Sequence, residues 1–225
     1  MAAPHPASPE PASPEPASPE PASPEPSAPR RTRRGTRTKD ALVAAARLIF
    51  ERDGYLDARI IDIAAEAGVA TGSFYTHFAS KEEIFTAVLT ELQDEMLHAG
   101  IGDGTRKDPG RGVADANRAY LEAYRRNAAL MAAMEQAAAV DRRFLQLRLQ
   151  RSQAFIDRSA VAITRLQKAG IADPALDPDI TARALNAMVS RMAYVTFAAD
   201  QPVPFETLVR TLTRLWMNAL RMPHE

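Results

Sequence analysis

A short segment in the N-terminal half carries the residues with the clearest chemistry. It reads Thr71-Gly72-Ser73-Phe74-Tyr75-Thr76-His77 and follows Gly68 closely. Helical spacing directs Phe74 and Phe78 inward and leaves the other side chains of the segment mostly outward. Short polar side chains near a helix N-terminus suit a helix that enters the major groove of DNA. The segment therefore predicts a DNA-recognition helix.

The same segment contains a pair of residues that suggests a nucleophile and its base. Ser73 and His77 stand four residues apart and share a helix face. No convincing acid or oxyanion hole accompanies them. The histidines at positions 5, 77, 98 and 224 lack metal-ligand spacing, and the chain has no cysteine and no phosphate-binding glycine loop. We therefore expect no catalytic residues, no metal, no cofactor and no enzymatic activity.

A helix-turn-helix pattern positions these side chains. A helix over about residues 60–67 ends at Gly68, where a turn needs a residue that tolerates positive φ. Ala64 is small enough for a close helix crossing, and Ile63 and Val69 lock the second helix, residues 71–78, at a steep angle. Small helical hairpins also occur in plain α-helical bundles. An α-helical sensor or interaction module that does not bind DNA therefore stays the alternative.

Two further helices frame this hairpin. Thr38 is a candidate cap for a helix with apolar residues at helical spacing up to Asp53-Gly54. Ser80 and Glu83 form a capping box at the start of a helix that runs to about His98. This last helix joins the hairpin to the rest of the chain, so it is the natural lever between the two parts.

The run from Ile63 to Phe85 closely resembles the DNA-binding domain of the TetR/AcrR family of bacterial transcriptional regulators. The resemblance extends back to Ala45, so it covers about 50 residues. It implies that Thr71 to Thr76 lie in the major groove and that Tyr75, His77 and Lys81 hold phosphates. The usual Thr/Ser pair before the second helix is Ala58-Arg59 here, which loses an N-cap but provides a cation for phosphate. The predicted DNA-binding residues are Arg59, Thr71, Gly72, Ser73, Tyr75, Thr76, His77 and Lys81.

Lys81 has a physical argument of its own. It lies in the first turn of a helix, which is unfavourable for a cation because the helix dipole is positive there. A phosphate arriving at that terminus would be bound by the free amides and the ammonium together. The alternative is an ordinary exposed lysine.

Charges are segregated along the chain, although 28 Lys and Arg balance 28 Asp and Glu. Residues 30–81 hold ten basic and six acidic residues, whereas residues 82–225 hold 18 of each. The basic arm is Arg30, Arg31, Arg33, Arg34, Arg37 and Lys39. We expect residues 30–37 to be a flexible arm that follows phosphates or the minor groove. The alternative is a solubilising run.

The first 29 residues have a composition of their own. Residues 6–25 are four copies of Pro-Ala-Ser-Pro-Glu. Proline at this density removes amide donors and favours polyproline II, so we expect residues 1–29 to be disordered. A solvated tether is the preferred interpretation, and P-x-x-P recognition by a partner is the alternative.

The remaining chain predicts an all-α protein with two folded domains. Residues 38–98 form the helix-turn-helix domain with its connecting helix, and residues 99–225 form a helical ligand-binding and dimerisation domain. Residues 100–112 are a glycine-rich loop. Helices follow over about 113–126, 128–140 running on or breaking into 141–168, 178–198 and 205–221. No segment approaches a membrane span, and no secretory signal is present, so we expect a soluble cytoplasmic protein that contacts the nucleoid when bound to DNA.

The last two helices have apolar faces wider than a surface helix requires. These faces are Ile180, Ala184, Leu185, Met188, Met192 and Val195, then Leu208, Leu212, Leu215, Trp216, Ala219 and Leu220. Their surplus predicts a four-helix interface in a homodimer, which is also where the resemblance places it. Burial of both faces inside one subunit is the alternative. Two recognition helices would then reach successive major grooves about 34 Å apart and read a palindrome.

A set of Met and aromatic residues is the candidate pocket for a mostly apolar effector. Glu135 and Arg191 lie on apolar helix faces, so we expect them to fix the polar end of that effector. The alternatives are a bundle core, a snorkelling surface pair, and Arg191 bridging the dimer. The predicted pocket residues are Tyr124, Met131, Met134, Glu135, Phe155, Met188, Arg191 and Met192. The whole pattern indicates a repressor that leaves a double-stranded operator when this small molecule binds.

Overall fold

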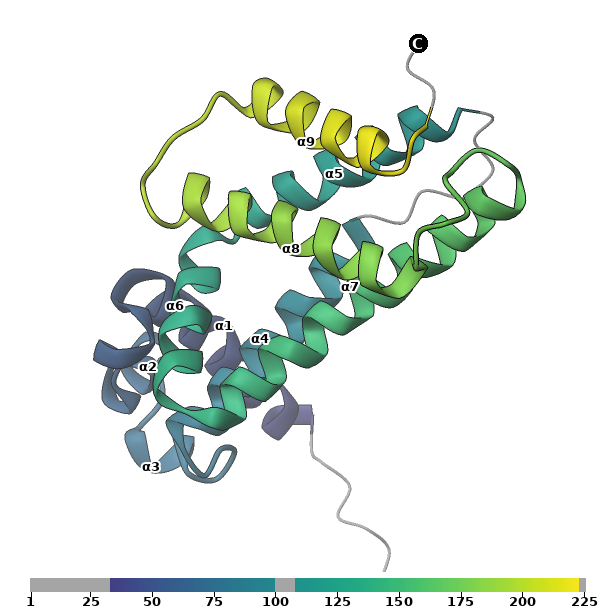
Figure 1. Cartoon of the computed structure of the whole chain (residues 1–225). Helices are drawn as coiled ribbons and strands as arrows, with labels where there is room; N and C mark the ends of the chain where they lie inside the picture. The colour runs from purple at the N-terminus through teal and green to yellow at the C-terminus, as the bar shows by residue number, and fades with distance from the viewer. Residues whose placement is uncertain (1–32, 100–107, 223–225) are drawn as a thin grey trace, which may run out of the picture.

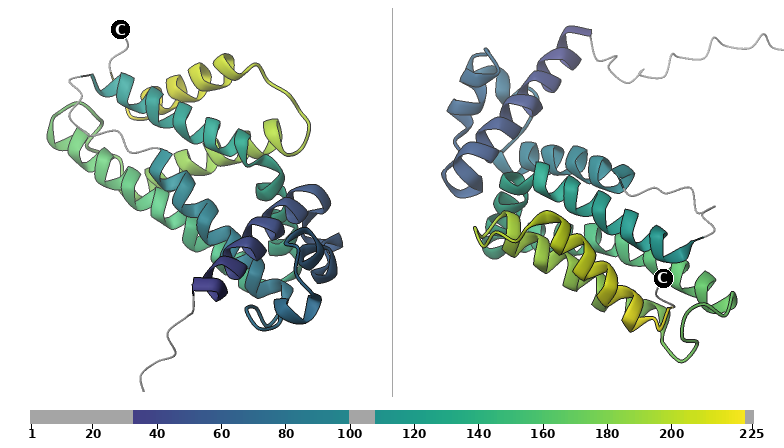
Figure 2. Two further views of the ribbon diagram at one scale, coloured as in Figure 1. Left: turned by 180° about the vertical axis from the view of Figure 1, so that it is seen from behind. Right: turned by 90° about the horizontal axis from the view of Figure 1, so that it is seen from above.

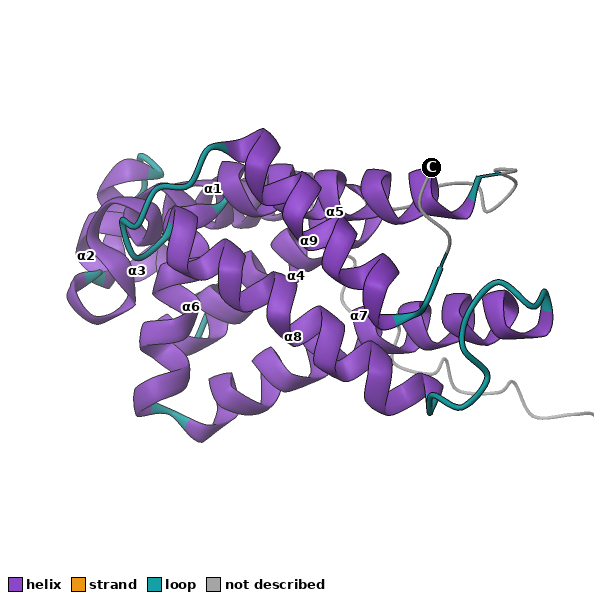
Figure 3. Ribbon diagram, turned by 45° about the horizontal axis from the view of Figure 1, so that its top comes forward, coloured by secondary structure: helices purple, strands orange, loops and turns teal. Residues whose placement is uncertain are grey.

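The computed structural model describes residues 33–99 and 108–222 of the chain. Within these residues every regular element is an α-helix, and no strand is present, as Figure 3 shows. The predicted all-α fold is confirmed. The expectations for residues 1–29, Arg30 and Arg31 lie outside the described residues.

The first helix, α1 (Arg33–Asp57), begins earlier than predicted. Thr38 lies inside it and is not its N-cap, which corrects the expected start. The added residues include Arg33, Arg34 and Arg37, which favour a helix, and Gly35 and Thr36, which do not, so helix propensity alone does not explain the early start. Near its other end Gly54 adopts φ 74° and ψ −179°, which interrupts the helix at the predicted place.

Three shorter elements complete the N-terminal unit, which we define as α1, α2 (Ile60–Glu66), α3 (Thr71–Phe74) and the first half of α4 (Lys81–Ala99). Its core is apolar and rich in aromatic rings. The ring of Phe85 lies 4.5 Å from that of Phe50 and 4.8 Å from that of Tyr55, measured between centroids. Phe74 and Phe78 are buried beneath α3, which confirms their predicted inward orientation.

Five helices form the C-terminal unit: α5 (Pro109–Arg126), α6 (Ala128–Val140), α7 (Arg142–Lys168), α8 (Pro178–Phe197) and α9 (Phe205–Ala219). Of the two predicted possibilities for α6 and α7, the break is the one observed. Asp141 takes an extended conformation between them, and its Oδ1 accepts a hydrogen bond from the Arg143 amide at 2.8 Å. The predicted Pro178 start of α8 is also confirmed.

The glycine-rich loop is shorter than the predicted 100–112. Helix α5 begins at Pro109 because Asp108 caps it, its carboxylate accepting from the Arg111 amide at 3.2 Å. Proline suits a first helical turn, since the amide that it lacks would have no partner there. Gly110 and Gly112 are therefore helical.

The two units lie at opposite ends of an elongated molecule (Figures 1 and 2). Helix α4 runs from the N-terminal unit into the C-terminal one, where Met96 is buried. Helix α6 packs extensively against α1, and α7 spans the length of the C-terminal unit against α6 and α8. None of the helices in the described residues has the length and hydropathy that crossing a membrane requires.

Candidate nucleic-acid interface and ligand region

The turn between α2 and α3 is built by a specific C-terminal cap. The Val69 amide donates to the Ala64 carbonyl and the Gly68 amide to the Ala65 carbonyl, both at 3.0 Å. This is the Schellman pattern, which needs a residue in the left-handed region after the helix. Gly68 has φ 67°, and a Cβ on it would meet no atom within 4 Å. Backbone conformation, and not crowding, therefore requires glycine here.

Helix α3 presents polar residues outward, as predicted. Thr71, Gly72 and Thr76 are exposed, Tyr75 is 57% exposed, and Ser73 and His77 are half-buried. The helix ends at Phe74 and not at Phe78, which corrects its predicted length. The Thr76 hydroxyl donates to the Ser73 carbonyl at 2.7 Å, a local bond that competes with the regular helix.

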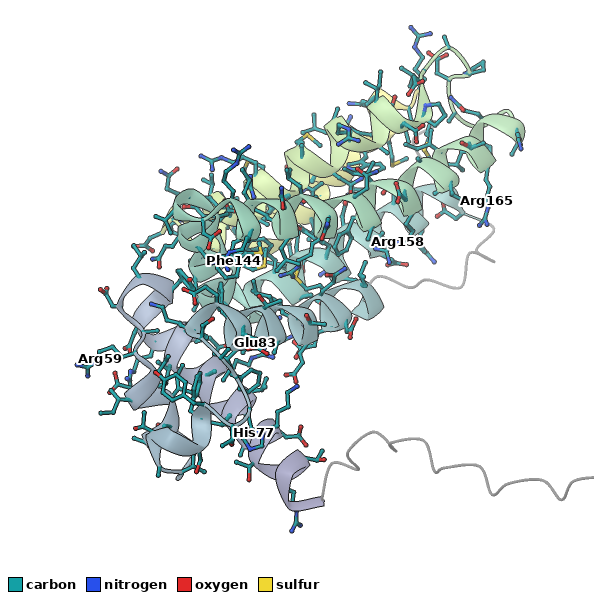
Figure 4. All side chains as sticks on the ribbon, turned by 90° about the horizontal axis from the view of Figure 1, so that it is seen from below. Arg59, His77, Glu83, Phe144, Arg158 and Arg165 are labelled. Carbon is teal, nitrogen blue, oxygen red and sulfur yellow. The ribbon has the colours of Figure 1, made fainter. Side chains whose placement is uncertain are left out.

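Arg59 lies on the same end of the molecule as His77, and far from Arg165 (Figure 4). Its side chain is 72% exposed and forms a two-bond ion pair with Asp62, at 2.7 and 3.0 Å. No side chain caps α2 at Arg59, in line with the loss expected from the Ala58-Arg59 sequence. A phosphate would have to compete with Asp62 for this guanidinium.

Lys81 has a full set of partners inside the protein. Its Nζ donates to the carbonyls of Tyr55, Leu56 and Ala58 at 2.8, 3.2 and 3.0 Å, and lies 4.8 Å from the Tyr55 ring centroid. The three donors of an ammonium are thereby satisfied. Lys81 fastens the end of α1 to the start of α4, and it is neither an ordinary exposed lysine nor free for phosphate in this state.

The start of α4 is fixed by neighbouring contacts. Ser80 Oγ accepts from the Glu83 amide at 3.3 Å, which confirms the predicted cap. The returning bond from the Glu83 carboxylate goes to the Ala79 amide at 2.6 Å, one residue earlier than in a standard capping box. Burial, aided by Glu82, raises the pKa of Tyr55 to about 12, so its neutral hydroxyl donates to the Glu82 carboxylate at 3.3 Å.

The basic arm is helical from Arg33 onward, which corrects the prediction of a flexible segment for residues 33–37. Arg37 is exposed. Lys39 is half-buried, and its Nζ lies 5.3 Å from the Phe78 ring centroid. Arg37 and Lys39 are therefore carried on the first turns of α1.

The predicted pocket residues divide into two groups. Tyr124, Met131 and Met134 are buried in the core of the C-terminal unit. Phe155, Met188 and Met192 are half-buried and pack against that core. Their role in ligand binding stays a prediction.

The two charged pocket candidates do not meet. Glu135 pairs with Arg148, at 3.0 Å between Oε2 and Nη1, while Arg191 is exposed, with its guanidinium 5.1 Å from the Tyr194 ring centroid. The buried face of α8 is Ala182, Leu185, Val189, Ala193 and Thr196. Arg191 lies beside that face and not on it.

The buried cation of the C-terminal unit is Arg151, which the sequence prediction did not identify. It is 5% exposed. Its Nη1 lies 3.3 Å from the Met134 sulfur, and its Nη2 lies 4.0 Å from the Met96 sulfur. The available signal was its spacing, because Leu147, Arg151 and Phe155 succeed one another at four-residue intervals on α7.

Side-chain bonds connect the two units. Arg47 of α1 donates to Glu95 of α4 at 2.7 Å and also to the Asn127 side chain at the start of α6. The Gln136 side-chain oxygen of α6 accepts from the Tyr55 amide at 3.0 Å. A Cβ on Gly54 would lie 2.6 Å from that oxygen, so the missing side chain permits this close approach. Movement of α4 or α6 must therefore affect α1.

Helices α8 and α9 leave apolar residues uncovered. Ile180 is 70% exposed, Leu215 is 43% exposed, and Ala184 is exposed beside the half-buried Met188. Both helices also contribute to the core through their opposite faces. Part of the apolar surface expected from the sequence is therefore uncovered. The other part is buried within this subunit, at Leu185, Leu208, Leu212, Trp216 and Leu220.

Two family models match the chain in its two units. Residues 42–88 match the family described as "Bacterial regulatory proteins, tetR family". Residues 113–221 match "Transcriptional regulator EthR, C-terminal domain". The first range contains α2 and α3 and part of α4, and the second contains α6 to α9 with most of α5.

Relatives and solved structures agree with these matches. The HTH-type transcriptional regulator EthR of Mycolicibacterium smegmatis is 28% identical over 190 residues, which cover 80% of this chain and 84% of the relative. Its namesake in Mycobacterium tuberculosis is 27% identical with 80% and 85% covered. A transcriptional regulator structure from Rhodococcus sp. Rha1 has a TM-score of 0.69 at 26% identity, covering 81% of this chain and 96% of its own. A putative TetR-family regulator from Mesorhizobium loti has the same fold, with a TM-score of 0.69 at 17% identity and coverages of 83% and 98%.

Proposed function

The chain belongs to the TetR family of bacterial transcriptional regulators, and on that premise we propose that it is a homodimeric repressor released from a palindromic operator by a small molecule. The helix-turn-helix is its DNA-binding domain. The observation that carries the proposal is the outward polar face of α3 at one end of the molecule. In this proposal residues 38–98 bind the operator, and residues 99–225 bind the effector and the second subunit, in the cytoplasm where the chromosome lies.

The proposed DNA contacts follow from exposure. Thr71, Gly72, Ser73 and Thr76 face base edges, while Tyr75 and His77 contact phosphates. Arg59 contacts a phosphate in exchange for Asp62, an exchange that costs little because exposed ion pairs are weak.

Two basic features support these contacts. Lys81 holds the loop before α2 and the start of α4 in place, and it binds phosphate only by releasing one of its carbonyls. The basic segment at the start of α1 adds salt-dependent affinity without base contacts.

The homodimer is proposed to form through the uncovered faces of α8 and α9. Their exposed apolar residues would be removed from water in a four-helix interface. A two-fold dimer places two α3 helices on one side of the assembly. A spacing of about 34 Å between them suits one turn of B-DNA, and the operator would then share the two-fold symmetry of the protein.

Release requires that the effector favour a different separation of the two α3 helices. The route proposed here is mechanical, because Arg47 joins α1 to α4 and α6, and Gln136 joins α6 to the end of α1. A ligand that shifts α4 or α6 inside the C-terminal unit would rotate the N-terminal unit. Its effect is limited by its differential affinity for the two states.

The experiment is gel retardation of DNA from upstream of the protein's own gene, at physiological salt. We expect retardation, with a loss of about tenfold or more for Thr71→Ala combined with Thr76→Ala. Ser152→Ala, an exposed hydroxyl on α7, is the matched control and should bind like the wild type. Arg59→Ala should lower the salt dependence by about one phosphate contact.

Two results would count against this function. Absence of retardation with every upstream fragment would favour an α-helical sensor that does not bind DNA. If the protein is a monomer at the concentrations that retard DNA, a palindromic operator is no longer expected, because it requires a two-fold dimer.

A further inference from the structure

Arg151 is a buried cation without an anion. It lies on α7 in the middle of the C-terminal unit and is 5% exposed. Its two terminal nitrogens have thioether partners, Met134 at 3.3 Å and Met96 at 4.0 Å. Among residues 33–99 and 108–222, no Asp or Glu forms an ion pair with it.

This arrangement is unfavourable for a guanidinium on its own. The group has five N–H donors, and thioether sulfur is a weak acceptor. A buried charge normally requires an opposite charge and good hydrogen bonds. Burial lowers the pKa of Arg151 to about 10, which still leaves it charged at neutral pH. Arg151 therefore lacks the counter-charge that a buried guanidinium normally has.

The surroundings of Arg151 are apolar and aromatic. Tyr120 and Tyr124 of α5 lie near the guanidinium. The Tyr120 ring packs edge-on against Phe155, with centroids 5.5 Å apart. Methionine side chains repack easily, so Met96 and Met134 can move aside for a guest.

A second arginine lies at the surface beside Phe155. Arg158, labelled in Figure 4, is seven residues after Arg151 on α7, and its Nη1 donates to the Leu97 carbonyl of α4 at 3.1 Å. Its guanidinium is exposed and lies 5.3 Å from the Phe155 ring centroid. Helices α4 and α7 thus meet through long cationic side chains, which would attract an approaching anion.

We propose that Arg151 binds the carboxylate of an apolar carboxylic acid whose hydrocarbon part lies among Tyr120, Tyr124 and Phe155. A guanidinium matches a carboxylate with two parallel hydrogen bonds. A single buried cation neutralises one negative charge, so a monoanion fits better than a doubly charged phosphate. This inference rests on the proposed function, since it names the class of effector that the C-terminal unit takes.

The site also explains how binding reaches the DNA. Arg151 touches Met96 of α4 and Met134 of α6, and both of these helices contact α1. A carboxylate inserted at Arg151 would displace both sulfur atoms. The bound acid would therefore shift α4 and α6, the helices through which we propose that ligand binding changes the position of the N-terminal unit.

The first experiment measures binding to the wild-type full chain by calorimetry. The probes are octanoate, decanoate and phenylacetate, each below its micellar range, with octanol, decanol and phenylethanol as neutral counterparts. We expect at least one acid to bind and to be preferred over its alcohol by about tenfold or more, the usual worth of a charge-assisted pair. Equal binding of acids and alcohols, or no binding of any acid, would overturn the proposal.

The second experiment locates the charge. Arg151→Met should abolish the preference for the acid over its alcohol, and Arg151→Lys should retain part of it. Arg165→Met, the same change at an exposed position of α7, should leave the preference intact. A preference that survives in Arg151→Met would overturn the assignment. Thermal unfolding establishes that each variant is folded. If Arg151→Met does not fold, the test is whether Arg151→Lys has a smaller preference for the acid than the wild type.

These outcomes are separable from those of the proposed function. Calorimetry without DNA reports on Arg151 alone, while gel retardation without ligand reports on α3 alone. Acid binding by a protein that retards no DNA would support the inference and reject the repressor.

Discussion

Two cations, one in each unit, show how differently the two parts of this molecule are built. Lys81 in the N-terminal unit has three carbonyl partners and an aromatic ring within reach. Arg151 in the C-terminal unit is more deeply buried and has only sulfur partners. Polar groups in a finished core are satisfied, as they are around Lys81. The C-terminal unit departs from that rule at Arg151, and this departure is the basis of the carboxylate site proposed above.

Other polar atoms repeat the contrast. Among the described residues, the buried side-chain atoms without a hydrogen-bond partner are Arg148 Nε, Thr196 Oγ1 and Trp216 Nε1. All three belong to the C-terminal unit. Among the described residues, the N-terminal unit therefore has a core without unsatisfied buried polar side-chain atoms. The C-terminal unit contains three such atoms.

The largest expected effect comes from replacing one aromatic residue in each core and comparing the two losses of stability. Phe85→Ala should reduce the free energy of unfolding by about 4 kcal/mol, because Phe85 is fully buried among aromatic rings. Phe155→Ala should cost about half as much, since Phe155 is half-buried. Urea denaturation at fixed protein concentration measures both. Equal losses would show that the two cores are packed alike.

Replacing the satisfied cation should be almost as costly. Lys81→Met leaves three carbonyls without their donor and should reduce the free energy of unfolding by about 3 kcal/mol. Lys168→Met, at an exposed position near the end of α7, is the control and should change stability by less than about 0.5 kcal/mol. A Lys81→Met protein as stable as the control would contradict the structural role given to this ammonium.

The same substitution at the unsatisfied cation should have the opposite sign. Arg151→Met removes a buried charge that lacks an anion and should raise the free energy of unfolding by about 1 kcal/mol. The ligand-free protein is the one to measure. A clear loss of stability would mean that Arg151 already has a counter-charge.

The smallest expected effect lies at the junction of the two units. Gln136→Ala removes the acceptor of the part-buried Tyr55 amide and should cost about 1 kcal/mol. Gln150→Ala on the exposed side of α7 is the matched control, with no expected change. If the Gln136 variant unfolds in two separate steps, the amide contributes to the coupling of the units as well as to their stability.

Local patterns predicted the elements that local residues determine. Gly68 ends α2 because its own backbone needs positive φ, and Ser80 caps α4 through an amide three residues away. Phe74 and Phe78 turn inward because of helical periodicity. In the same way, the Asp177-Pro178 pair located the start of α8.

The partners of charged side chains depend on which helices meet, and periodicity does not contain that information. Arg151 and Arg191 both follow apolar spacing, but α7 turns Arg151 toward α4, α5 and α6, whereas α8 turns Arg191 toward solvent. Lys81 finds carbonyls at the end of α1 and just after it, 23 to 26 residues earlier in the chain. The predicted start of α1 was wrong because a residue suited to an N-cap, Thr38, can also lie inside a helix.

The junction between the units has a consequence for the cell. The bond between Gln136 and the Tyr55 amide joins two uncharged groups. Dissolved ions strongly screen the attraction between the protein and DNA, but they hardly change the strength of a part-buried hydrogen bond between neutral groups. A change in salt concentration would therefore alter the affinity for DNA while leaving this connection between the two units unchanged.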